Sequence, residues 1–301
     1  MEKIKKISII IPFHDEKENL PILLQGILDE CKKMPFLYEI VLVDDGSLDD
    51  YLPGISRFID HKLVQLVKLN RQMGKGRALS EGIEKSDGEV LAFMDADLQD
   101  DPTDIQKLIA KLESGFDLVN GIRLSRQDNL IIKIYSKLAG GFLRTYLRSP
   151  FTDINCGYKV FRRKILKTIV LYGNNFRFLP LAAFYDGYKV GELGVTNKPR
   201  IHGKSKFGMS KLFIGIVDTL SAYFLYKFAE KPLHFFGKIG AWLLVIGGAA
   251  LAWVTYERIF FGVLLYRRPA LQYAIFLIIL GIQVVMTGII GELIVYLHKK
   301  K

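Results

Sequence analysis

Up to about residue 125, the chain alternates short apolar runs with segments of helical periodicity. The apolar runs cover residues 7–11, 38–43, 64–69, 89–94 and 117–122. They are almost continuously apolar, which is typical of strands in a parallel sheet that is covered on both faces. The segments with apolar residues at helical spacing are 16–33, 74–86 and 102–115. This alternation predicts an α/β fold with a doubly wound sheet.

The pattern changes towards the C-terminus, where two runs contain no charged residue. They extend from Ile239 to Tyr256 and from Ala270 to Gly291. Each run is about long enough to cross a hydrocarbon core, which takes ~20 helical residues, and each is apolar all round. We therefore predict a hairpin of two transmembrane helices at about 236–256 and 271–297. A buried helical hairpin in a soluble domain is the alternative.

The segment before the hairpin is also apolar, but single charged residues interrupt it. We expect residues 209–234 to form an amphipathic helix that lies in the membrane interface. Residues 130–147 are a second candidate for such a helix, and a core helix is the alternative for both. The expected domains are an α/β domain at 1–208, the interfacial helix at 209–234 and the hairpin at 235–301.

Charge and cysteine content add the expected compartment. The formal net charge is +11, which suits a protein that binds phosphates or lies against anionic lipid. The apolar stretch at 7–11 is too short for a secretory signal, and basic residues flank the hairpin at Lys238 and at 298–301. We therefore expect a cell-membrane protein whose two termini and α/β domain are cytoplasmic. Cys31 and Cys156 lack metal-binding spacing and are expected to be free thiols.

An acidic cluster, "DADLQDD", follows the fourth apolar run. Asp95 and Asp97 could share one divalent cation, and Gln99 would add a carbonyl oxygen; such hard ligands suit Mg²⁺ or Mn²⁺. Asp100 and Asp101 precede the next helix, so we interpret them as capping residues at its N-terminus. In open α/β sheets, ligands bind at the carboxyl ends of the strands, which is where this cluster falls.

Two other predicted strands also end in acidic residues. Asp44 and Asp45 follow the second strand, and Asp15 and Glu16 follow the first. Carboxylates at these positions could accept hydrogen bonds from a nucleobase and a ribose. No G-x-G-x-x-G sequence follows the first strand, so the pattern does not predict a dinucleotide-binding fold.

Six motifs occur in order along the chain: "IPFHDEKENL", "VDDGS", "NRQMGKGRAL", "MDADLQDDP", "TDINCGYKVFRR" and "RIHGKSKFG". Together they resemble the motifs of one enzyme family, the inverting GT-A glycosyltransferases. The sequence is most similar to the branch that acts on polyprenyl phosphate, which includes dolichyl-phosphate mannose synthases and bacterial undecaprenyl-phosphate sugar transferases. Bacterial members share the C-terminal two-helix hairpin, so the resemblance covers nearly the whole chain.

The resemblance implies a set of functional residues. Metal ligands would be Asp95, Asp97 and Gln99, and catalytic residues would be Asp97, Arg123, Asp153 and Arg200. The nucleotide-sugar site would comprise Pro12, His14, Glu16, Asp44, Asp45, Lys75, Asp95, Ala96, Arg123, Arg200, Ser205 and Lys206. The acceptor phosphate would meet Lys133, Lys137, Arg144 and Arg148. The sequence departs from the family pattern at three positions, His14, Asp15 and Lys159, where the family has Tyr, Asn and Arg.

The implied reaction moves a sugar from a nucleotide-diphospho-sugar to a membrane polyprenyl phosphate, of the undecaprenyl or dolichyl type. A UDP-sugar is favoured as donor, GDP-mannose is the second option, and the cofactor would be Mg²⁺ or Mn²⁺. The acceptor phosphate would attack the anomeric carbon with inversion. Asp153 would orient the acceptor or act as a weak base, and the alternative is a capping residue.

Other readings of the sequence remain open. A membrane-anchored nucleotide-sugar sensor or scaffold would bind without turnover, whereas a polysaccharide synthase would use another acceptor and would need a Q-x-x-R-W motif that the sequence lacks. No nucleic-acid partner is expected. A homo-oligomer is an option, because six glycines would permit close helix packing: Gly240, Gly247, Gly248, Gly281, Gly288 and Gly291. Within the hairpin, Glu292 could pair with Lys238.

Overall fold

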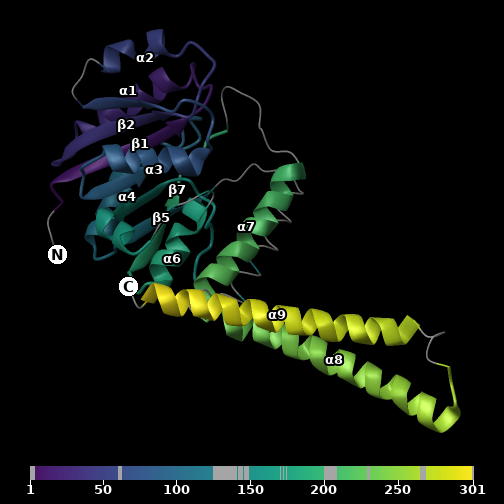
Figure 1. Ribbon diagram of the computed structural model, residues 1–301. Coiled ribbons are helices and arrows are strands. Elements are labelled where there is room, and N and C mark those ends of the chain that lie inside the picture. Colours follow the sequence, from purple (N-terminus) through teal and green to yellow (C-terminus); the bar gives the residue numbers. More distant parts are fainter. Residues whose placement is uncertain are drawn as a thin grey trace. The chain divides into compact units, whose positions relative to one another are not determined.

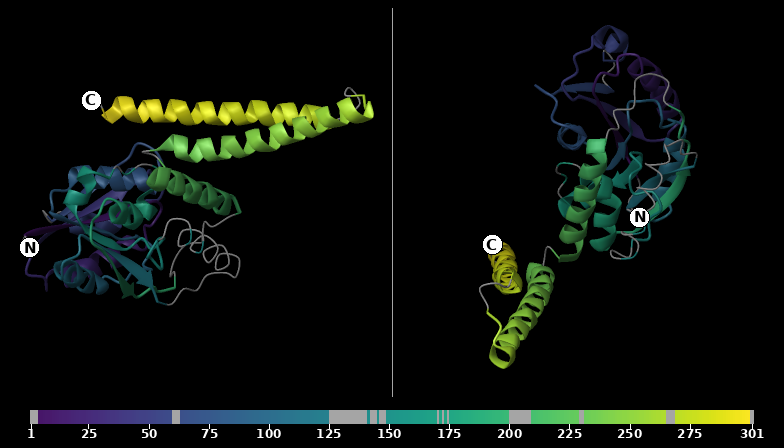
Figure 2. Two further views of the ribbon diagram at one scale, coloured as in Figure 1. Left: turned by 90° about the horizontal axis from the view of Figure 1, so that it is seen from below. Right: turned by 90° about the vertical axis from the view of Figure 1, so that its right-hand side faces the viewer.

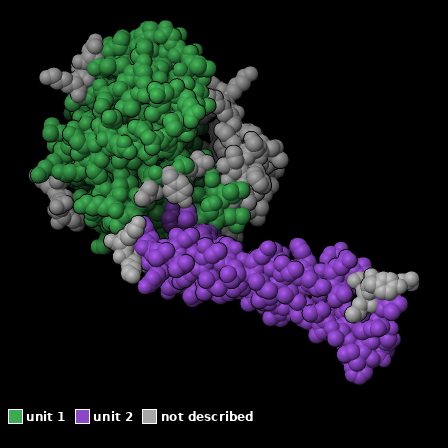
Figure 3. Space-filling view, in the orientation of Figure 1, with its two compact units in different colours: residues 1–222 green, residues 223–301 purple. Residues whose placement is uncertain are grey.

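The structure is a computed structural model and forms two compact units, Met1–Ala222 and Tyr223–Lys301 (Figure 3). The residues that it describes are 4–59, 63–124, 141, 145, 149–169, 171, 173, 175–199, 209–228, 231–264 and 269–299. Each unit is described by itself below.

The first unit is built on a sheet whose strand order is β3-β2-β1-β4-β6-β5-β7 (Figure 1). The predicted α/β fold is confirmed, although the sheet is mixed: β6 is antiparallel to both β4 and β5, and the other paired strands are parallel. The last two strands were not predicted. The strands are β1 (Lys6–Phe13), β2 (Leu37–Asp44), β3 (Val64–Lys68), β4 (Val90–Phe93), β5 (Leu118–Arg123), β6 (Lys159–Arg162) and β7 (Val190–Val195).

Helices lie on both faces of this sheet (Figure 2). Each of the three predicted helices is present, and α2 and α6 are additional. The helices are α1 (Leu20–Cys31), α2 (Leu52–Ile59), α3 (Lys75–Lys85), α4 (Asp104–Glu113) and α6 (Leu179–Tyr185), with short 3-10 helices η1 (Arg163–Lys167) and η2 (Asn175–Phe178).

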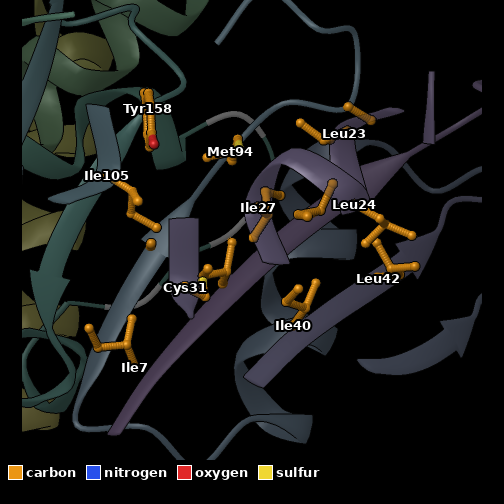
Figure 4. Packing of buried hydrophobic residues seen from close by; sticks show 14 of the residues in the cluster. Ile7, Leu23, Leu24, Ile27, Cys31, Ile40, Leu42, Met94, Ile105 and Tyr158 are labelled. Carbon is orange, nitrogen blue, oxygen red and sulfur yellow. The ribbon is translucent and has the colours of Figure 1, made fainter. Parts of the chain in front are cut away.

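The central strands β1, β2 and β4 are mostly buried on both faces, which explains why they are almost continuously apolar. On one face, Ile7 and Ile40 belong to the same buried cluster as Ile27 of α1 and Ile105 of α4 (Figure 4). On the other face, α3 packs so closely that a Cβ on Gly82 would lie 2.4 Å from Cγ2 of Ile10. Burying an aliphatic side chain contributes about 1.5–3 kcal/mol, so this double layer holds the strand ends in place.

Strand direction decides which loops meet. The carboxyl ends of β1, β2, β4, β5 and β7 lie at one edge of the sheet, because these strands run the same way. Strand β6 runs the opposite way, so its first residue, Lys159, and the turn before it lie at that same edge. The antiparallel strand therefore adds the 153–158 turn to the loops that the sequence placed there.

The second unit contains a hairpin of two long helices, α8 (Pro232–Phe261) and α9 (Pro269–Lys299), which lie side by side (Figures 1 and 2). Both are long and apolar enough to cross a membrane. Large apolar side chains face outwards: Trp242 is 69% exposed and Phe276 is 61% exposed. Such an exposed apolar surface fits lipid contact better than the buried soluble hairpin considered from sequence.

Glycines allow the two hairpin helices to approach closely. A Cβ on Gly240 would lie 2.8 Å from the carbonyl oxygen of Gly281, and one on Gly247 would lie 2.9 Å from Cγ1 of Ile278. Gly288 and Gly291 likewise face residues of α8. These glycines pack the two helices of the hairpin against each other, and the homo-oligomer stays a prediction. Gly248 is different, because nothing lies within 4 Å of the position of its Cβ.

Glu292 does not form the ion pair predicted for it. Its Oε2 accepts a hydrogen bond of 3.2 Å from the backbone N–H of Leu233, in the first turn of α8. Among the described ion pairs, none joins Glu292 to Lys238. A carboxylate at this place accepts a hydrogen bond from an N–H group that has no partner within its own helix, and the positive end of the helix dipole stabilises its charge.

A further helix, α7 (Met209–Phe228), begins in the first unit and ends in the second. It ends before Pro232, where α8 begins. It covers most of the segment predicted to lie in the membrane interface, and that placement stays a prediction. The second interfacial candidate, at 130–147, lies largely outside the described residues.

Candidate active site

The loops at the carboxyl edge of the sheet bring most of the predicted site residues together. Asp45 follows β2, Lys75 begins α3, Asp95 follows β4 and Arg123 ends β5. Asp153 comes from the turn before β6. Five separate segments thus contribute ionisable side chains to one edge.

Asp95 carries the first carboxylate of the acidic cluster, and Lys75 neutralises it. The Lys75 ammonium contacts Asp95 Oδ1 in a short ion pair, and both side chains are about one-third exposed. Burial opposes ionisation of Asp95, but the charge of Lys75, with those of Lys159 and Arg123, holds its pKa below the usual value. Gly157 packs against the same carboxylate, because a Cβ on it would lie 2.8 Å from Oδ2 and 3.0 Å from Oδ1 of Asp95.

The next residues turn the chain sharply. Leu98 adopts a φ of 60°, which is costly for a residue with a branched side chain, and Asp97 Oδ1 accepts a hydrogen bond of 3.2 Å from the N–H of Gln99. The side-chain amide of Gln99 makes a long contact of 3.5 Å with the carbonyl oxygen of Lys198. Among the described residues, no group of three or more His, Cys, Asp or Glu side chains could hold a metal. The predicted set has two carboxylates and one amide.

Asp100 and Asp101 accept hydrogen bonds from different parts of the chain. Asp101 Oδ1 accepts hydrogen bonds from the N–H and the hydroxyl of Thr103, at 3.1 and 2.9 Å, so it satisfies donors at the start of α4 as predicted. Asp100 instead turns inwards and accepts a bond of 3.3 Å from the N–H of Asp95, so its predicted capping role was wrong. Burial and the neighbouring charge of Asp95 raise the pKa of Asp100 to about 7.

The two carboxylates after β2 are buried, and both bind parts of the protein. Asp44 accepts hydrogen bonds from the Tyr51 hydroxyl at 2.6 Å and from the N–H of Ser47 at 2.7 Å. Asp45 Oδ1 accepts bonds from the N–H groups of Met73 and Gly74, at 2.7 and 3.1 Å. Asp45 therefore fixes the loop that ends at Lys75, whether or not it also contacts a nucleotide.

The residues after β1 form hydrogen bonds with the loop after β2. His14 Nδ1 lies 2.9 Å from the carbonyl oxygen of Asp45, and since a carbonyl only accepts, Nδ1 carries the proton. Asp15 has a φ of 57°, and its Oδ1 accepts a bond of 2.7 Å from the N–H of Leu48. Among residues with a side chain, Asn and Asp tolerate this backbone conformation best, which explains why an Asp suits position 15.

Other predicted pocket residues are placed as follows. Pro12 is buried within β1, opposite Val43 of β2. The Glu16 carboxylate accepts a hydrogen bond of 2.5 Å from the side-chain amide of Asn19, the residue before α1. Ala96, which stands between Asp95 and Asp97 in the sequence, is buried.

Arg123 and Asp153 form a two-bonded ion pair. Arg123 Nε lies 2.7 Å from Asp153 Oδ2, and Arg123 Nη2 lies 2.9 Å from Oδ1. The side chains are 20% and 11% exposed. A planar guanidinium held by two bonds to a carboxylate is fixed in direction, so Asp153 aims the remaining N–H groups of Arg123.

Sequence reasoning missed Glu192, which supports this pair, and it noted Lys159 only as a departure from the family pattern. Glu192 on β7 accepts hydrogen bonds from the N–H and the hydroxyl of Thr152, at 2.9 and 2.8 Å, and so holds the turn that carries Asp153. Lys159 is 1% exposed, and its ammonium donates to the carbonyl oxygens of Ile154, at 3.2 Å, and Cys156. Burial lowers the pKa of Lys159 to about 8. The sequence signal for this lysine was its place at the end of "CGYK", where the family pattern has Arg.

The chain after β7 is attached to the acidic cluster. The N–H of Lys198 donates to the carbonyl oxygen of Gln99 at 2.8 Å, and the Lys198 ammonium lies 2.6 Å from Asp101 Oδ2. The basic loop predicted to bind phosphates starts directly after this attachment. Arg200, Ser205 and Lys206 of that loop, and the acceptor candidates Lys133, Lys137, Arg144 and Arg148, lie outside the described residues.

The fold of the first unit is that of the GT-A sugar transferases. A similar solved structure is glucosyl-3-phosphoglycerate synthase from Mycobacterium tuberculosis in complex with Mn²⁺ and UDP-glucose, at 17% identity and a TM-score of 0.58, over 73% of this chain and 79% of that one. Mannosyl-3-phosphoglycerate synthase from Rubrobacter xylanophilus matches at 15% identity and a TM-score of 0.57, over 73% and 74% of the chains. These likenesses show the fold.

The family follows from the sequence comparison. Residues 8–170 match the model described as Glycosyl transferase family 2, so the chain belongs to this family and is a glycosyltransferase. Dodecaprenyl-phosphate galacturonate synthase of Rhizobium johnstonii is 32% identical over 295 residues, which is 96% of this chain and 87% of the relative. Undecaprenyl-phosphate 4-deoxy-4-formamido-L-arabinose transferase of Proteus mirabilis is 30% identical over 297 residues, which is 97% and 89%.

Proposed function

We propose that this glycosyltransferase moves a sugar from a UDP-sugar to the phosphate of a membrane polyprenol, with inversion and with the help of Mg²⁺ or Mn²⁺. The observation that carries the proposal is the gathering of Asp95, Asp97 and Arg123 at one sheet edge of a chain with two helices able to cross a membrane. Two relatives that match nearly the whole chain are named for polyprenyl phosphate, which supports this acceptor class.

The side chains after β4 fit a hard divalent cation. Asp95 and Asp97 offer carboxylate oxygens and Gln99 an amide oxygen, which are the ligand types that Mg²⁺ and Mn²⁺ prefer. The charge of its lysine partner holds the pKa of Asp95 below the usual value, so this carboxylate carries the negative charge that a cation needs. When bound, the ion would act as a Lewis acid that stabilises charge on the departing diphosphate.

The chain's own residues would supply orientation and charge. An oxygen of the acceptor phosphate attacks the anomeric carbon while the bond from that carbon to the nucleotide diphosphate breaks. A phosphate monoester is largely ionised near neutral pH, because its second pKa is about 6, so no strong general base is required. Arg123 would neutralise phosphate oxygens, and Asp153, already bonded to Arg123, would hold it in place.

The nucleotide would lie over the loops after β1 and β2. Asp45 and His14 hold these loops together, and Asp45 also holds the loop that ends at Lys75. Arg200, Ser205 and Lys206 would close over the diphosphate, and Lys133, Lys137, Arg144 and Arg148 would meet the acceptor phosphate. The α/β unit and both termini would face the cytoplasm.

A turnover assay with the purified full chain tests the proposal. The reaction would contain Mn²⁺ or Mg²⁺, a short polyprenyl phosphate, and either a panel of UDP-sugars or GDP-mannose, with products identified by mass. We expect one UDP-sugar to give a polyprenyl-phosphate-linked monosaccharide. Donor binding with no lipid product from any pair would contradict the proposal and would favour a sensor that binds without turnover.

A further inference from the structure

The position of Lys75 is set by the protein before any ligand arrives. Asp45 accepts hydrogen bonds from the N–H groups of Met73 and Gly74, which fixes the backbone just ahead of Lys75. Gly74 has a φ of 91°, so a residue with a side chain would be strained at this turn. The Lys75 ammonium also lies 5.1 Å from the ring centre of Phe176, a buried aromatic residue of η2. Backbone and ring together hold the side chain over one spot.

That spot is Oδ1 of Asp95, which the Lys75 ammonium contacts. Gly157 packs against the same carboxylate, because a Cβ on it would lie 2.8 Å from Oδ2 and 3.0 Å from Oδ1. A divalent cation bound to Oδ1 would need the lone pairs that the ammonium now faces. Two cations this close repel each other strongly, because the protein surface screens their charges less than bulk water does. Lys75 and a metal ion therefore compete for Asp95.

We propose that Lys75 is a resident counter-ion that occupies Asp95 until the metal arrives together with the donor diphosphate, so that it couples metal binding to donor binding. The inference rests on the proposed function, because it takes Asp95 as a metal ligand. The diphosphate supplies the ammonium with new anionic oxygens, which compensates it for the loss of the carboxylate. Metal alone offers no such replacement and binds weakly.

The coupling has a thermodynamic signature that works in both directions. If UDP raises the affinity for the metal by some factor, the metal must raise the affinity for UDP by the same factor. Removing the ammonium leaves Asp95 open to the metal at all times, so metal binding without nucleotide becomes tighter. It also removes a partner of the diphosphate. The metal should therefore raise the affinity for UDP by a smaller factor, and UDP should raise the affinity for the metal by that same smaller factor.

The test measures Mn²⁺ binding to the full chain in detergent, from the electron paramagnetic resonance signal of the free ion, with and without UDP. Lys75→Met removes the charge and keeps much of the length, and Lys75→Gln is a polar second variant. Lys164→Met is the matched control, because Lys164 is an exposed lysine of η1 that forms an ion pair with Asp117. Thermal unfolding of each variant shows that it is folded.

We expect both Lys75 variants to bind Mn²⁺ at least about tenfold more tightly than the wild type without UDP, and to show a smaller gain on adding UDP. The control should behave as the wild type. Unchanged or weaker Mn²⁺ binding by the Lys75 variants would overturn the inference and leave the proposed function intact. Absence of Mn²⁺ binding to every protein, with or without UDP, would overturn the metal site itself and the inference with it.

Discussion

Replacing Asp153 by Asn tests whether this residue holds Arg123 or acts as a base. The carboxylate makes two bonds to Arg123, of 2.7 and 2.9 Å, in a pair that is mostly shielded from water. Asn keeps one acceptor oxygen but loses the charge and one bond. Hydrogen bonds to charged groups contribute about 1.5–3 kcal/mol each, so we expect Asp153→Asn to lower the free energy of unfolding by about 2 kcal/mol. For a unit of this size, that lowers its Tm by ~4–8 °C.

The chain carries separate natural probes for its two units. Its two cysteines, Cys31 and Cys156, are buried in the first unit, so a thiol-reactive dye reports the unfolding of that unit. Its two tryptophans, Trp242 and Trp253, lie in α8, so their fluorescence reports the hairpin. The dye assay in detergent should show the lower Tm for Asp153→Asn, while the tryptophan signal stays unchanged.

A matched control is available in the same unit. Asp29 forms an exposed ion pair of 3.4 Å with Lys32, and Asp29→Asn should change the Tm by less than about 1–2 °C because exposed pairs contribute little. In the turnover assay, Asp153→Asn should lose kcat by less than about a hundredfold, which is the lower limit for removing a general acid or base. An unchanged Tm together with a larger loss of kcat would refute the positioning role and identify Asp153 as a base.

Two further predictions concern the hairpin and a buried lysine. Glu292→Gln weakens the bond to the N–H of Leu233 and should destabilise the hairpin by about 0.3–1 kcal/mol, seen as a lower midpoint in the tryptophan signal; an unchanged midpoint contradicts the capping role. For Lys159, the pKa in the folded protein is about 8, below the usual 10.5, so the unfolded chain binds more protons between these values and stability rises with pH there. The Tm of the wild type relative to Lys159→Met should therefore rise between about pH 7 and pH 10 in circular dichroism melts, whereas a constant difference contradicts a buried titrating ammonium.

Most of the strands that the sequence predicted are buried ones, and their burial is visible in the local sequence; β3, which is partly exposed, is the exception. Strands β1, β2 and β4 are apolar on both faces, so their sequences show continuous runs. Strand β6 has four residues, and β7 is interrupted by Gly191 and Gly194. Both depend on pairing with distant strands, which no local pattern reveals. The antiparallel direction of β6, which brings Asp153 to the site, is set by that pairing.

The acidic residues show the same limit at the level of single side chains. The sequence placed carboxylates at the strand ends, but it could not tell which of them bind the protein itself. Asp44 is engaged by Tyr51, and Asp100 turns inwards to the backbone of Asp95. Glycine spacing in the hairpin likewise indicated close helix packing without saying which helix was the partner.

The most direct test of the metal-dependent transfer is lipid product formed by the full chain and by Asp97→Asn under the same conditions. Purified protein would be incubated with Mn²⁺, the preferred UDP-sugar and a short polyprenyl phosphate, with a chelator added to a parallel sample. We predict a polyprenyl-phosphate-linked sugar from the wild type, and its loss both in Asp97→Asn and with the chelator. Product formed equally well by the variant, or in the presence of the chelator, would contradict a metal-assisted transfer at the acidic cluster after β4.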